Sequence, residues 1–164
     1  MTHTMNKLSR HTDLEIEVIF RDDSGAEIPV PAYPFRLRYF TNPLHPAIAL
    51  QDAEGRLVNC AMAGGRLHVY LDKPRFDAGV LRCRHELDVP GEEFPDAVRT
   101  IVREGVLDAR IVNNPFVYSA KPVIDNIVVT ELDRYQEFVA AEDGSLLETE
   151  DNCVIQIFEQ DGRN

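Results

Sequence analysis

The strongest periodicity in the sequence has a step of two residues and is seen in DLEIEVIFR, which runs from Asp13 to Arg21. Its apolar residues occupy every second position and its glutamates fall between them: Leu14, Ile16, Val18 and Phe20 alternate with Glu15 and Glu17. Strict alternation of this kind predicts a β-strand with one buried face. The next four residues, DDSG, predict a turn, because glycine accepts a positive φ and Asp or Ser side chains bond the nearby backbone.

The same two-residue period returns along the chain. It is found in Phe35–Phe40, Arg66–Leu71 and Val80–Leu87, and two further short strands, Ala47–Gln51 and Arg56–Cys60, flank a predicted hairpin loop. Short alternating runs separated by turn residues about every eight to twelve positions are typical of sandwiches and barrels. The sequence therefore predicts an all-β fold, an Ig-like antiparallel β-sandwich.

Residues 94–110 fit two local structures. Pro95 and Gly105 are placed to begin and end a short helix. The β-branched residues between them favour a strand instead, with a turn at Glu104-Gly105 and Leu107–Val112 as the partner strand. We predict the strand and turn.

Two regions are expected. The sandwich domain covers residues 13–112, and Asn113-Asn114-Pro115 marks its end. Residues 113–164 form an acidic, mixed α/β C-terminal extension with a β-like run (Val123–Thr130), helical spacing (Glu131–Ala141) and a closing strand (Cys153–Phe158). The extension has too few apolar residues for its own core, so we expect it to pack on the sandwich or on a neighbouring subunit.

The composition excludes some classes of function. The 164 residues include 28 acidic and 17 basic side chains, a net charge of -11, so binding of nucleic acid by bulk charge is not expected. No apolar run approaches the roughly 20 residues of a membrane-spanning helix, and the N-terminus has no hydrophobic stretch typical of a signal peptide. We expect no membrane partner, a cytoplasmic location, and free thiols at Cys60, Cys83 and Cys153.

Two pairs of arginines are the first candidate binding or interface residues. Arg36 and Arg38 share the outward side of one predicted strand, and Arg82 and Arg84 share that of another. Such clusters bind phosphate, acidic sugars or acidic protein surfaces. We favour the interpretation that these arginines form cross-strand ion pairs with Glu15, Glu17 and Glu86. A role in a subunit interface is the second choice, and ligand binding is the third.

His68 and Tyr70 are further binding candidates, because both are predicted to point outward from one strand. A metal site formed by Cys83, His85 and His68 is a weaker alternative, since buried cysteine usually acts as a small apolar residue and no standard zinc spacing is present. The DDSG turn lacks the ligand pattern of an EF-hand. We expect no metal and no cofactor.

No catalytic motif is present: the sequence has no GxSxG, HExxH, P-loop or GxGxxG pattern, so we expect no enzyme. The order of LEIEVIF, DDSG, FRLRYF, GGRLHVYLD, DAGVLRCRHEL, FPDAVRT and LDARIV across residues 13–112 resembles the N-terminal domain of phage baseplate and tail-fibre proteins, particularly the upper baseplate type. It is also similar to tail-associated proteins from prophages of gut Bacteroidetes. Ala97 stands where that domain is expected to have glycine.

The resemblance implies a β-sandwich that works through subunit contacts and carries no catalytic residue. We therefore predict a non-enzymatic structural or assembly protein, a prophage tail or baseplate component. Its partners would be copies of itself or other tail subunits, first in the host cytoplasm and then in the virion. The alternative is a carbohydrate- or ligand-binding module of a host-attachment apparatus, with tyrosines such as Tyr70 as candidates because the chain has no tryptophan.

Overall fold

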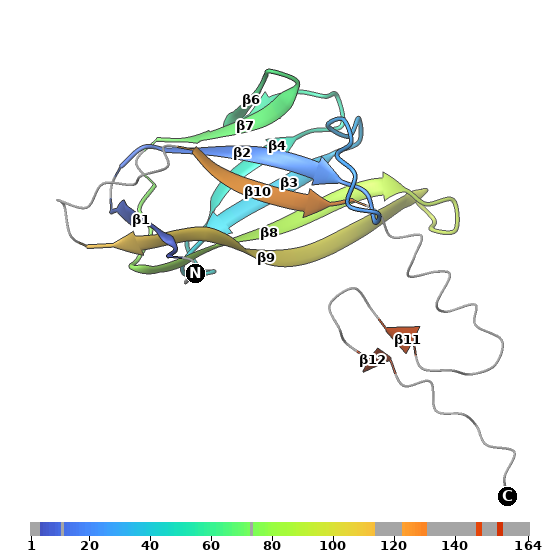
Figure 1. Ribbon diagram of the computed structural model, residues 1–164. Helices are drawn as coiled ribbons and strands as arrows, with labels where there is room; N and C mark the ends of the chain where they lie inside the picture. Colours follow the sequence, from blue (N-terminus) through green and yellow to red (C-terminus); the bar gives the residue numbers. More distant parts are fainter. Residues whose placement is uncertain are drawn as a thin grey trace, which may run out of the picture.

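The computed structural model describes residues 4–10, 12–72, 74–113, 123–130, 147–148 and 154–155. It is an all-β sandwich of two sheets (Figure 1). The six-stranded sheet has the order β1-β9-β8-β3-β4-β5, formed by Asn6–Ser9, Val98–Val112, Gly79–Pro90, Phe35–Phe40, Ala47–Gln51 and Leu57–Val58. The four-stranded sheet has the order β10-β2-β7-β6, formed by Val123–Val129, Leu14–Arg21, Arg66–Leu71 and Cys60–Ala63. No helix that could cross a membrane occurs among these residues.

The alternation in the sequence matches the burial of side chains. The inward residues of β2 and β7, such as Ile16 and Val69, are fully buried, and so are Leu37 of β3 and Leu81 of β8. They belong to one core between the sheets, which contains a contact between the Phe20 and Phe35 rings with centroids 5.5 Å apart. The prediction of half-buried strands is confirmed for these segments.

The predicted turn at Glu104-Gly105 is wrong. β9 runs through both residues without a break, and Gly105 lies opposite Cys83 of β8. The continuous strand forms because β8 itself extends over 12 residues and provides a backbone partner along nearly all of β9. The chain turns earlier, at residues 91–97, where Ala97 adopts a φ of 57°.

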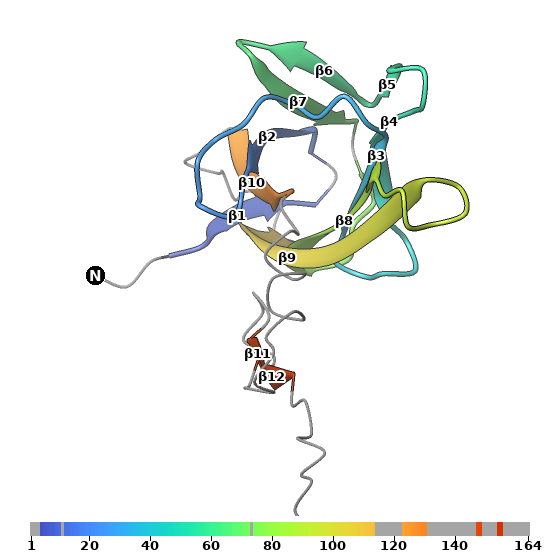
Figure 2. The same ribbon diagram turned by 90° about the vertical axis from the view of Figure 1, so that its right-hand side faces the viewer.

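The prediction of a purely antiparallel sandwich is wrong, because two pairs of strands are parallel. β1 pairs with the end of β9 in parallel, and β10 pairs with β2 in parallel over seven residues, from Val123↔Glu15 to Val129↔Arg21. Both strands lie outside residues 13–112. The six-stranded sheet therefore includes a segment that precedes the expected sandwich domain, and the four-stranded sheet includes a segment that follows it. Figure 2 shows the two sheets curving around the core, with β10 near β9 where two of their edges meet.

Little of the expected extension can be compared with the structure. Val123–Val129 is a strand, as its composition predicted. Further along, β11 (Leu147–Glu148) pairs with β12 (Val154–Ile155) in an antiparallel arrangement. The predicted helix at Glu131–Ala141 and most of the closing strand at Cys153–Phe158 lie outside the described residues. The Ig-like assignment stays a prediction.

Candidate functional site

The four candidate arginines lie together on the outer face of the six-stranded sheet. β3 and β8 run antiparallel, and the register places Arg38 directly opposite Arg84, Arg36 opposite Glu86, and Phe40 opposite Arg82. Like charges directly opposite each other on neighbouring strands destabilise a sheet. The Arg38–Arg84 pair therefore needs a compensating anion.

One carboxylate provides that compensation. Arg36 Nη1 donates to Glu86 Oε2 at 2.8 Å, while the Nε atoms of Arg38 and Arg84 lie 3.4 Å and 3.8 Å from Oε1. Arg82 forms a separate pair with Glu104 of β9, with 3.3 Å between Nη1 and Oε1. The four arginines thus share two glutamates. We call these six side chains the arginine cluster, which has a surplus of two positive charges.

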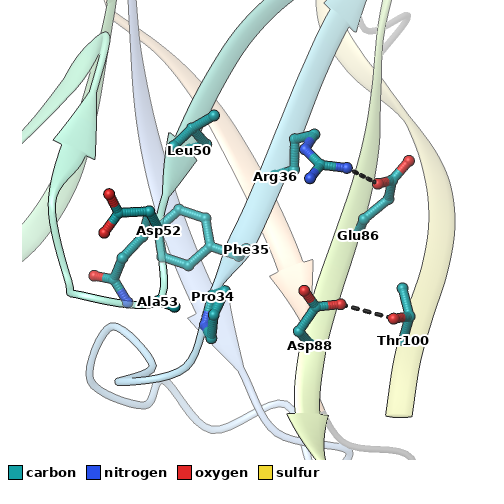
Figure 3. Close-up of a pocket in the computed structure, with 10 residues that line it drawn as sticks. Pro34, Phe35, Arg36, Leu50, Asp52, Ala53, Glu86, Asp88 and Thr100 are labelled. Atoms are coloured by element: carbon teal, nitrogen blue, oxygen red, sulfur yellow. Dashed lines mark hydrogen bonds and ion pairs between the residues drawn. The ribbon is translucent and has the colours of Figure 1, made fainter. Parts of the chain in front are cut away.

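The surface around the arginine cluster is hollowed on two sides. A shallow cavity of about 520 Å³ extends from Arg36 and Glu86 to Asp52, Asp88 and Thr100 (Figure 3). Thr100 donates to Asp88 Oδ1 at 2.7 Å. A second cavity of about 280 Å³ adjoins Arg38 and Arg84 and is lined in part by Phe40, Pro43 and Pro46. Both cavities are open and mixed in polarity, which suits contact with another surface.

Exposed valines lie beside the cluster. Val102 of β9 is opposite Glu86 and is 47% exposed, and Val106 is opposite Arg82 and is 59% exposed. On its side away from β8, β9 pairs with β1 only over Ala109–Val112. The outer face of the six-stranded sheet therefore combines arginines with apolar side chains.

His68 and Tyr70 are on the opposite side of the sandwich, on the outer face of the four-stranded sheet. His68 Nδ1 lies 3.0 Å from Glu15 Oε1, and its Nε2 lies 3.7 Å from Glu17 Oε2. The His68 and Tyr70 rings stack with centroids 6.3 Å apart, and Tyr70 is 47% exposed. The structure therefore divides the predicted site residues between two faces.

The expected ion pairs are correct for Glu86 and wrong for Glu15 and Glu17. Those two glutamates belong to the other sheet, where Glu15 contacts His68 and Glu17 pairs with Arg66. Arg66 also binds Glu27 through two hydrogen bonds of 2.7 Å. The hydrogen bonds to Arg66 and its positive charge lower the pKa of Glu27. The hydrogen bonds to Glu27 and Glu17, together with their negative charges, raise the pKa of Arg66.

The residues of the alternative metal site do not meet. Cys83 and His85 point into the core from β8, whereas His68 lies on the outer face of the other sheet. Burial raises the pKa of the Cys83 thiol to about 12 and lowers that of His85 to about 4. No group of three or more His, Cys, Asp or Glu side chains placed to hold a metal occurs within the described ranges. The DDSG segment is a turn in which Asp22 Oδ1 accepts hydrogen bonds from the Ser24 and Ala26 backbones.

A buried polar network in the core was not predicted. Asn126 of β10 is 6% exposed and donates to the Tyr39 hydroxyl at 2.9 Å and to Cys83 Sγ at 3.3 Å. Burial is the main cause that raises the pKa of Tyr39 well above its usual value. The sequence signal was the polar Asn126 between the apolar residues Ile124 and Val128, but Asn126 lay in the segment assigned to the extension.

No protein-family model, curated protein or solved structure matches the chain.

Proposed function

We propose that this protein is a non-enzymatic assembly protein that acts through contacts between subunits, and that the outer face of its six-stranded sheet is a contact surface. More specifically, the protein is proposed to be a prophage tail or baseplate component with an Ig-like sandwich. The partners are further copies of the chain or other tail subunits. The protein would be present in the host cytoplasm before it joins the virion.

The Arg38–Arg84 pair is the observation that carries the proposal. Two positive charges directly opposite each other are unfavourable in an isolated sheet. Glu86, and Glu104 opposite Arg84 on β9, compensate only part of the charge of the four arginines. An acidic partner would remove the repulsion. Arginine suits such a partner, because its planar guanidinium presents several donors to a carboxylate at once.

The neighbouring side chains also favour a protein partner. Arginine is enriched in protein interfaces, and interface cores contain apolar side chains beside polar ones. Val102 and Val106 supply apolar surface next to Glu86 and Arg82. The tail or baseplate role itself is supported by the resemblance of strand and turn order across residues 13–112, which contains the whole arginine cluster.

The first experiment measures the mass of the full chain in solution. Light scattering over a range of concentrations should give a mass above the monomer mass of 18.6 kDa, rising with concentration. A constant monomer mass up to millimolar concentration would contradict self-assembly. In that case the contact surface would have to bind a different tail subunit and not a second copy of the chain.

A carbohydrate- or ligand-binding module is the second candidate function. The stacked, exposed Tyr70 beside His68 favours it, because sugars bind on exposed aromatic rings. However, among the described residues the only aromatic one that lines the larger cavity is Phe35, which is 2% exposed. Strong and selective binding on a glycan array, lost in Tyr70→Ala, would favour this function over assembly.

A further inference from the structure

The charge of the chain is unevenly distributed along the sequence. Residues 131–164 include ten acidic and two basic side chains and so carry -8 of the net charge of -11, which leaves -3 for residues 1–130. Three of the acids follow one another closely at Glu148, Glu150 and Asp151. We call residues 131–164 the acidic segment.

We propose that the acidic segment of one copy binds the arginine cluster of a neighbouring copy. This inference rests on the proposed function and names the partner of that same surface. The surplus of two positive charges in the cluster and the charge of -8 in the segment are complementary. Nucleic acid is a poorer occupant, since a chain of charge -11 would repel it.

The acidic segment and the arginine cluster are connected to different sheets of the chain. The acidic segment follows β10, and β10 is an edge strand of the four-stranded sheet. The arginine cluster faces outward from the other sheet, on the opposite side of the sandwich. A contact between copies would join the cluster on one subunit to the segment that follows β10 of the next subunit. A contact of this kind is head-to-tail, and such contacts build rings or filaments.

Two full-length variants remove one side of the contact each. The cluster variant is R38Q/R84Q, which keeps Arg36 on Glu86 and removes the opposed like charges, so the fold should be retained. The segment variant is E148Q/E150Q/D151N. Matched controls change the same number of charges away from the cluster. They are R66Q/R75Q for the first variant, with Arg66 on the other sheet, and D23N/D72N/E92Q for the second.

Sedimentation velocity at low salt gives the decisive comparison. We expect the wild type and both controls to self-associate, and each variant alone to have a dissociation constant raised about tenfold or more, since several exposed ion pairs are lost. Mixing the two variants should restore a one-to-one complex, because the intact segment of one can bind the intact cluster of the other. High salt should weaken wild-type association.

The outcomes separate this inference from the proposed function. If the wild type associates and either variant associates equally well, the acidic segment is not the occupant, while assembly still holds. The same conclusion follows if both variants are monomeric and the mixture forms no complex. If the wild type is a monomer at every concentration, self-assembly fails and this inference fails with it. Thermal melts of each variant establish that a lost complex does not reflect unfolding.

Discussion

His85 makes the stability of the sandwich sensitive to mild acid. It lies in the core with 6% of its surface exposed, opposite Leu37 of β3 and Arg103 of β9. Burial first, and then the positive charge of Arg103, lowers its pKa from 6.5 to about 4. Its Nε2 atom has no hydrogen-bond partner within the part of the chain that the structure describes. His85 is therefore neutral in the folded protein at pH 7.

The direction of the effect follows from which state binds the proton first. The unfolded chain protonates His85 near pH 6.5, whereas the folded protein resists protonation until about pH 4. The free energy of unfolding should therefore be unaffected by His85 above pH 7 and should fall as the pH drops from 6.5 towards 4. Between pH 7 and pH 5 these two pKa values correspond to a loss of about 2 kcal/mol.

Urea unfolding at pH 7 and pH 5 measures this loss in the wild type and in His85→Leu. Leucine matches the apolar neighbours and removes the titration, so the loss should be about 2 kcal/mol smaller in the variant. The hydrogen-bonded carboxylates Asp22, Glu27 and Asp52 have lowered pKa values, and the stability they contribute is lost at lower pH. An equal loss in both proteins would refute the account of His85.

Three other changes test the fold. Ala97→Gly should raise the free energy of unfolding by about 0.5–1 kcal/mol, because Ala97 has a φ of 57° that glycine adopts without strain. A lower melting temperature of this variant would contradict the prediction. Asn126→Ala should cost about 2 kcal/mol in urea unfolding, since it removes the donor to Tyr39 and Cys83, and unchanged stability would count against the network. Cys83, with a pKa raised to about 12 by burial, should resist iodoacetamide at pH 8 in the folded protein and react in urea. Mass spectrometry of the labelled peptides checks this, and rapid labelling of folded Cys83 would contradict its placement.

The sequence predicted the local structure better than the pairing of strands. Alternation in segments such as Leu14–Arg21 and Phe35–Phe40 depends on nearest neighbours along the chain, so it is visible in the sequence. The turn expected at Gly105 was wrong because the long partner strand β8 determines the course of β9. The parallel pairing of β10 with β2 joins residues more than 100 positions apart, and no local pattern encodes it.

In the candidate site, too, the sequence predicted the direction of side chains but not the pairing that brings them together. The outward direction of Arg36, Arg38, Arg82 and Arg84 followed from strand periodicity. Their gathering around Glu86 depends on the register between β3 and β8, which places Arg38 opposite Arg84. The register also decides that Glu15 and Glu17 belong to the other face. Sequence periodicity gives the side of a strand, and only the topology gives the sheet to which that side belongs.

In the proposed assembly, subunits meet on the outer face of the six-stranded sheet. Val106→Glu and Ile127→Glu place the same charge on opposite faces, at valine and isoleucine side chains that are 59% and 50% exposed. Val106 lies opposite Arg82, so the new carboxylate should be tolerated in the folded subunit. Sedimentation velocity over a range of concentrations should show weakened self-association for Val106→Glu and wild-type behaviour for Ile127→Glu. Loss of association in Ile127→Glu alone would contradict the claim.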